Sequence, residues 1–172
     1  WLEMNFSENF FDVAMGDASF NNLATKEDNE QLIRVLKKVI QKEGYIVLRS
    51  LEFPKIDPIP IEELVSLYRA EKISFPDFLG ELRLVLPLEN LYNKQTFQLD
   101  ADKVFCWIEE QYKRGILNKE ERDKVFLYKN SLINTFYSED EFIGLFEKNG
   151  FKLIEKFKGN KYRFQKYIGM YV

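Results

Sequence analysis

The first fifty residues contain two short apolar runs joined by a segment of helical periodicity, and this arrangement limits the folds open to the chain. Residues 10–17 (FFDVAMGD) and 45–48 (YIVL) are typical of buried strands. Between them, apolar residues recur at helical spacing from Leu32 to Ile40. Two strands of one sheet that are joined by a helix must be parallel, with a right-handed crossover. The sequence therefore predicts an α/β unit at its start.

Capping patterns predict where three helices begin. A cap residue precedes an acidic residue by three positions at Thr25/Asp28, Asn118/Glu121 and Ser138/Glu141. The first helix is expected to end near Glu43–Gly44 and the last at Asn149–Gly150. Residues 151–157 then alternate between apolar and charged, Gly159–Asn160 predicts a turn, and residues 162–172 predict a last strand. Strands joined by so short a turn must be antiparallel.

The middle of the chain has a different character. Three of the five prolines lie in residues 54–60 (PKIDPIP), which predicts an extended connector. From residue 61 to about 134 the pattern is helical, in four expected pieces: 61–73, 76–92, 101–114 and 119–133. The many aromatic residues in this stretch either form a core or, if the stretch lies over the sheet, a lid that excludes water.

Composition excludes several classes of function. Net charge is −3, from 25 Lys and Arg against 28 Asp and Glu, so no broad positive field attracts nucleic acid, and nucleic-acid binding is not expected. The chain has no histidine, and a single cysteine, Cys106, so neither a metal site nor a disulfide framework is expected. With no apolar run long enough to cross a membrane and no leader pattern, we expect a cytoplasmic protein. A start at Trp1 rather than methionine indicates a partial or processed chain.

Three segments resemble parts of class I S-adenosylmethionine-dependent methyltransferases, and they stand in the family's order. NFSENFFDVAMGDASFNNL resembles the region around the family's fourth strand, KVIQKEGYIVLRS the approach to its fifth strand, and FIGLFEKNGFKLIEKF its late helix and strand. The resemblance covers somewhat under half of the chain. It implies the C-terminal part of a Rossmann-like fold: a mostly parallel sheet, a C-terminal antiparallel hairpin, and a helical insertion after strand five. The glycine-rich cofactor loop of the family is missing from these 172 residues.

This resemblance implies an organisation and a function. Residues 1–53 would be the second half of a cofactor-binding α/β core, residues 54–137 a helical insertion or lid, and residues 138–172 the last helix and hairpin of the same core. The implied activity is methyl transfer from S-adenosyl-L-methionine to a small molecule, with the fragment inactive by itself. The alternative is a non-catalytic protein-interaction module. A missing N-terminal half, a partner or a dimer would cover the open sheet edge.

The resemblance also implies site residues, each with a simpler reading beside it. Asp17 would be the catalytic residue, although it could merely cap the following loop. The implied cofactor-binding residues are Trp1, Leu2, Gly16, Asp17, Ala18, Ser19 and Phe20, and the implied substrate-binding residues are Asn21, Asn22 and Arg49. Trp1 could instead be a frayed end, the asparagines could form local turn hydrogen bonds, and Arg49 could form a surface ion pair. No metal ligands are implied.

Overall fold

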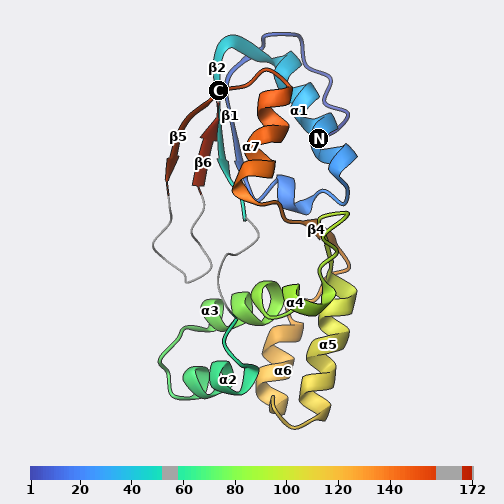
Figure 1. Cartoon of the computed structure of the whole chain (residues 1–172), viewed down its shortest axis with the longest axis vertical. Helices are drawn as coiled ribbons and strands as arrows, with labels where there is room; N and C mark the ends of the chain where they lie inside the picture. Colours follow the sequence, from blue (N-terminus) through green and yellow to red (C-terminus); the bar gives the residue numbers. More distant parts are fainter. Residues whose placement is uncertain (52–57, 158–167, 172) are drawn as a thin grey trace.

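The computed structural model describes residues 1–51, 58–157 and 168–171, which form an elongated molecule of two units (Figure 1). The upper unit in this view is a four-stranded sheet with helices α1 and α7 on one side. The lower unit consists of short helices and lies beyond the carboxyl ends of strands β1 and β2. No helix within the described ranges is long and apolar enough to cross a lipid bilayer.

The sheet combines a parallel pair with an antiparallel hairpin. Its strands are β1 (Phe11–Asp17), β2 (Ile40–Arg49), β6 (Ile168–Tyr171) and β5 (Leu153–Phe157), in this spatial order. β1 pairs with β2 in parallel, whereas β2 with β6 and β5 with β6 are antiparallel. The parallel pair and the hairpin were both predicted. The expectation of a mostly parallel sheet is not met in the described residues, because β1 lies at an edge and has only one neighbour.

Helix α1 (Lys26–Val39) covers one face of the β1–β2 pair. Thr25 Oγ1 accepts a hydrogen bond from the Asp28 N–H at 3.0 Å, as the capping pattern predicted. The buried apolar side chains of α1 pack against the inward-facing side chains of β2 and the aromatic side chains of α7. They share one helical face and comprise Leu32, Ile33, Leu36 and Val39. The stability of α1 therefore comes chiefly from the burial of this apolar face.

Helix α1 ends at Val39, five residues before the predicted end at Gly44. The chain instead enters β2 at once, and Ile40 pairs with Phe11. From this pair to the next, β1 advances by two residues and β2 by five, so residues 41–44 bulge out of the ladder. A Cβ on Gly44 would lie 2.5 Å from Ile40 Cγ2, so only glycine fits this bend.

Helix α7 (Glu139–Lys148) packs beside α1 through aromatic rings. Phe146 is fully buried, and its ring centroid lies 5.3 Å from that of Phe142 and 5.7 Å from that of Phe151. Both lie in edge-to-face geometry, which adds to the hydrophobic gain. Ser138 and Glu141 form the predicted capping box. Gly150, at φ +77°, follows the end of the helix as predicted.

The lower unit has a hydrophobic core of its own. Its helical elements are α2 (Ile61–Arg69), α3 (Phe75–Gly80), the π-helical turn η2 (Glu81–Val85), α4 (Leu88–Leu91), α5 (Ala101–Lys113) and α6 (Lys119–Phe126). Sequence periodicity predicted longer helices, with the last one reaching residue 133. It missed a two-stranded ribbon, β3 (Gln98–Asp100) with β4 (Ile133–Thr135). Strands of three residues are too short to show a period.

Some predictions concern residues outside the described ranges. They are the part of the extended connector at 54–57, the Gly159–Asn160 turn, residues 162–167 of the last strand, and Val172. The described backbone of residues 168–171 is a strand, as predicted.

Candidate functional site

The carboxyl ends of β1 and β2 meet at one edge of the sheet, where open α/β sheets bind their ligands. Asp17 and Arg49 are register partners there and form a two-point ion pair. Arg49 Nε donates to Asp17 Oδ1 and Arg49 Nη2 donates to Asp17 Oδ2, both at 2.6 Å. The Asp17 side chain is 66% exposed and the Arg49 side chain 47%. Water therefore weakens the pair, which fixes geometry more than it adds stability.

The loop after β1 turns sharply back onto the sheet. Ala18 adopts a left-handed conformation at φ +49° and its N–H donates to the Arg49 carbonyl oxygen at 2.7 Å. Gly16 lies so close to the loop that an added Cβ would be 2.8 Å from Ser19 Oγ and 2.9 Å from Leu48 Cδ2. Phe20, in the short 3-10 helix η1 (Phe20–Asn22), is buried against the rings of α7. The loop is thus held in place by packing at Gly16 and Phe20.

A cavity of about 320 Å³ follows β1 along the edge that pairs with no other described strand. This volume lies near the lower limit of the roughly 300–1,000 Å³ usual for small-molecule sites. Its walls are almost entirely apolar, and Ser19 supplies the one hydroxyl. They consist of Trp1, Met4, Phe6, Phe11, Val13, Ala14, Met15, Gly16, Ser19, Phe20, Leu32, Leu36, Val39, Ile46 and Leu48. None of these lining residues has a side-chain carboxylate or amine.

The structure separates the predicted site residues into three groups. Trp1, Gly16, Ser19 and Phe20 line the cavity. Asp17, Ala18, Asn22 and Arg49 lie around the loop and the ion pair, outside the cavity wall, while Leu2 packs against the upper core and Asn21 is buried. The roles assigned to them stay predictions. The contributions of Met4, Phe6 and Ala14 to the cavity were missed, although the repeated phenylalanines of residues 6–11 were a signal for an apolar cluster.

Asn21 is the centre of a buried hydrogen-bond network that joins the two units. Its Nδ2 donates to the Leu51 carbonyl at 2.7 Å and to the Thr135 carbonyl at 2.8 Å, and its Oδ1 accepts from the Leu51 N–H at 2.8 Å. Thr135 Oγ1 in turn donates to the Phe20 carbonyl and accepts from Asn29 Nδ2. In this conformation every polar group of the Asn21 side chain is used by the chain itself.

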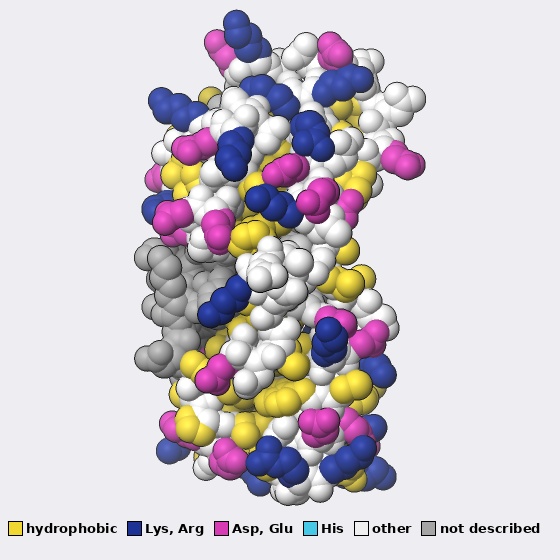
Figure 2. Space-filling view, turned by 45° about the vertical axis from the view of Figure 1, so that its right-hand side comes forward, with side chains coloured by type: hydrophobic (Ala, Val, Ile, Leu, Met, Phe, Trp, Pro, Cys, Tyr) yellow, Lys and Arg dark blue, Asp and Glu magenta, His cyan; other side chains and the backbone are white. Residues whose placement is uncertain are grey.

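The charged surface around the site is mixed in sign. Figure 2 shows acidic and basic side chains interspersed over the visible face, without a large area of one sign. Near the network, burial raises the pKa of Tyr137 to about 12, so its hydroxyl stays protonated at neutral pH. Among the side chains that the structure describes, no group of three or more Asp, Glu or Cys residues is placed to hold a metal ion.

No protein-family model and no curated protein sequence matches the chain, but solved structures share its fold. The PH0226 protein of Pyrococcus horikoshii matches with a TM-score of 0.51 at 11% identity, over 99% of this chain and 55% of its own. A SAM-dependent methyltransferase from Methanosarcina mazei matches with a TM-score of 0.49 at 14% identity, over 99% and 61%. A Rhodobacter sphaeroides structure named for zinc-dependent alcohol dehydrogenases matches with a TM-score of 0.51 at 10% identity. The match covers 95% of this chain and 59% of that protein.

The chain therefore spans little more than half the length of the proteins that it resembles. A parallel β1–α1–β2 unit that continues into an antiparallel hairpin defines an α/β protein with an open sheet. The chain shares this fold with the PH0226 protein of Pyrococcus horikoshii. At these identities the likeness concerns the fold alone, and one fold serves many functions.

Proposed function

We propose that this chain provides the part of an S-adenosylmethionine site next to the reactive methyl group, in a protein that transfers this group to a small molecule. The observation that carries the proposal is the cavity along β1, which reaches the loop after this strand at Gly16, Ser19 and Phe20. Four residues that the resemblance assigned to the cofactor line this one cavity: Trp1, Gly16, Ser19 and Phe20. Ligands of open α/β sheets bind at the carboxyl ends of the strands, where this loop lies.

The cavity fits two parts of such a cofactor. Its aromatic walls, which include Trp1, Phe6 and Phe11, suit the flat faces of adenine, and aromatic faces also attract a cation such as a sulfonium. No lining residue offers a carboxylate for the ribose hydroxyls. The proposed site therefore needs a further segment or chain for its sugar, in keeping with the missing glycine-rich loop.

When bound, the cofactor would supply an electrophilic methyl group, and the task of the protein would be to align donor and acceptor. The Asp17–Arg49 pair would hold the loop beside the methyl end. Because both carboxylate oxygens of Asp17 accept from Arg49, we propose that Asp17 acts through its position and not as a general base. Arg49, which is half exposed, could exchange this partner for a carboxylate on the substrate. The helical unit beyond the strand ends would be the lid.

The test is a titration of the ¹⁵N-labelled chain with S-adenosylmethionine, followed by amide chemical shifts, which detect weak binding. We expect shifts confined to residues 14–20 and to the Trp1 indole. Ala14→Leu, which fills the cavity, should abolish them, whereas Ala70→Leu on the exposed end of α2 should not. Shifts that scatter over both units, or none at millimolar cofactor, would contradict the proposal.

A second candidate, a non-catalytic interaction module, is favoured by the exposed apolar side chains along β1. Met15 is 82% exposed and Val13 and Tyr45 are about half exposed. Such a surface usually meets another protein. If the chain binds no cofactor but associates with another protein through this surface, this second function would account for the result.

A further inference from the structure

The two edges of the sheet differ in how they are protected against pairing. β5, at one edge, carries Glu155 and Lys156, both exposed, and Lys156 forms an ion pair with Glu139. Charged side chains of this kind, lysine above all, keep natural edge strands unpaired. β1 (FDVAMGD), at the other edge, contains neither lysine nor proline, and Arg49 neutralises its Asp17. Within the described ranges, Asp12 is the one charge on this edge that no ion pair neutralises, so β1 is less protected than β5 and is better suited to accept another strand.

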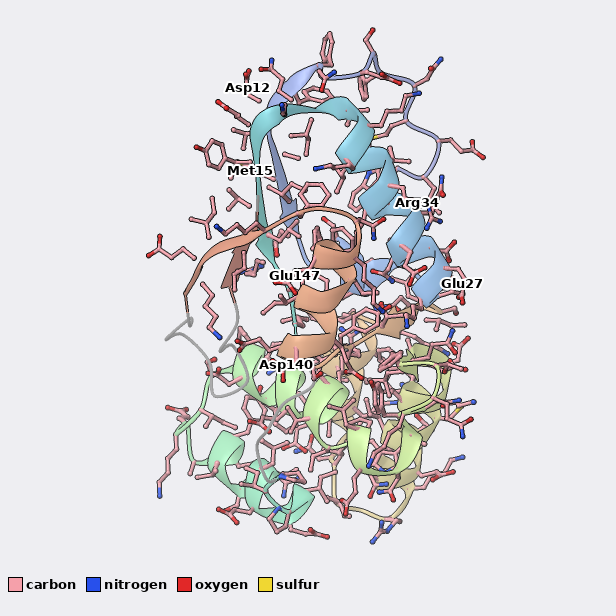
Figure 3. The ribbon with its side chains drawn as sticks, turned by 45° about the horizontal axis from the view of Figure 1, so that its top comes forward. Asp12, Met15, Glu27, Arg34, Asp140 and Glu147 are labelled. Atoms are coloured by element: carbon pink, nitrogen blue, oxygen red, sulfur yellow. The ribbon has the colours of Figure 1, made fainter. Side chains whose placement is uncertain are left out.

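Exposed apolar side chains gather along the same edge. Among the described residues, eleven large hydrophobic side chains are exposed, and six of them belong to this region: Trp1, Phe6, Phe10, Val13, Met15 and Tyr45. They are connected through the cavity that follows β1, through ring contacts, and through the pairing of Val13 with Tyr45. Met15 lies on the side of the sheet away from α1, which carries Glu27 and Arg34 (Figure 3). This concentration marks an interface.

We propose that β1 pairs with β1 of a second copy of this chain, antiparallel, about a twofold axis at Ala14. In this register Ala14 faces its own copy, and Val13 faces Met15, so exposed apolar side chains meet across the strands. Asp12 faces Gly16 and Asp17 faces Phe11, so no like charges are opposed. A twofold interface uses one surface twice, and this register meets that requirement.

The exposed aromatic side chains alone supply about half of the area that a standard interface buries. Trp1, Phe6, Phe10 and Tyr45 are between 43% and 65% exposed. Since an aromatic side chain can bury about 150–250 Å², these four offer roughly 400 Å² per copy. Met15 and Val13 add to this, toward the about 800 Å² per partner of a standard interface. The second copy would also close the open side of the β1 cavity.

The first test is the mass of the 172-residue chain by sedimentation over a range of concentrations, without any cofactor. We expect a dimer of twice 20.6 kDa that dissociates on dilution. Met15→Lys puts a charge at the interface, at a position that is 82% exposed, and should raise the dissociation constant at least tenfold. Leu127→Lys, at a position 83% exposed on the helical unit, should leave it unchanged. A monomer at the highest soluble concentration, or equal effects of both lysines, would overturn the proposal.

The second test is of the register. Facing residues of an antiparallel pair have Cβ atoms about 4.5–5.5 Å apart, close enough for a disulfide after a small adjustment. In a Cys106→Ser background, Ala14→Cys should therefore crosslink under mild oxidation, and Leu127→Cys, which is more exposed, should not. A dimer in which the two variants crosslink equally, or in which only Leu127→Cys does, would refute pairing at Ala14.

The proposed interface and the proposed cofactor site share the β1 edge, because Trp1, Phe6, Val13 and Met15 line the cavity and also belong to the interface. A monomer that binds S-adenosylmethionine would refute the dimer alone. A dimer whose monomers, obtained by dilution, also fail to bind it would refute the enzymatic function alone.

Discussion

Replacing Asn21 with alanine should weaken the connection between the two units and lower the stability of the whole chain. The substitution removes the partners of the Thr135 and Leu51 carbonyls and of the Leu51 N–H. Thr135 is fully buried, so its carbonyl would stay without a partner, at a cost of about 1–3 kcal/mol. Leu51 is only half buried, and water can replace part of what it loses. We therefore expect a total loss of about 2–4 kcal/mol, or roughly 5–15 °C in melting temperature for a chain of this size.

The measurement is urea unfolding followed by circular dichroism, with Asn22→Ala as the matched control. Asn22 is the next residue, is exposed, and accepts a single hydrogen bond from Asn134 Nδ2 at 3.2 Å. Its removal should change the free energy of unfolding by less than about 0.5 kcal/mol. If the two variants unfold at the same urea concentration, the network does not hold the units together. Asn21 would then be free for the substrate role that its position in the loop predicted.

Three further predictions concern other parts of the fold. Burial, the largest single influence on Glu121, raises the pKa of its carboxyl group. The hydrogen bonds from Arg69 and from the Asn118 N–H, together with the positive charges of Arg69 and Lys124, outweigh burial and lower the pKa. The ionised carboxylate therefore stabilises the chain above the unfolded value of about 4.3, and this effect is lost as pH falls through the folded value. The difference in urea midpoint between wild type and Glu121→Gln should accordingly shrink from pH 7 to pH 3. Gly44→Ala, whose Cβ would lie 2.5 Å from a side-chain carbon, should destabilise by about 1–3 kcal/mol in thermal melts, whereas Gly144→Ala, in open space on α7, should not destabilise at all. Phe146→Ala should lower the free energy of unfolding by about 3–5 kcal/mol, and a loss below 1 kcal/mol would contradict the assignment of this ring to the core.

The elements that sequence predicted well are those whose signal is local. The caps at Thr25, Asn118 and Ser138 all form, because each needs only a side chain and an N–H three residues away. The end of α1 was misplaced because it depends on the pairing of Ile40 with Phe11, which lies 29 residues earlier in the chain. The β3–β4 ribbon was missed for the same reason, because each of its short strands forms only by pairing with the other.

The candidate site was predictable in position but not in content. Asp17 and Arg49 each follow an apolar run, so their meeting at the sheet edge could be expected from the strand order, but their mutual ion pair could not. The cavity wall includes Trp1, Met4 and Phe6, which precede any regular element and reach the site only because the chain folds back over α1 and β1. The spacing of apolar residues does not predict the course of such an irregular segment.

The loop after β1 connects the chemistry of the sheet edge to the position of the helical unit. Phe20 anchors this loop in the upper core, and the next residue, Asn21, bonds to β4 of the ribbon that leads into the lower core. A ligand that moved the backbone at Ser19 or Phe20 would therefore pull on Thr135, whose hydroxyl donates to the Phe20 carbonyl at 3.0 Å. Coupling of this kind needs no long pathway, because one turn of chain contacts the cavity and both cores. The helical unit would thus respond to what occupies the cavity, which the lid role proposed for it requires.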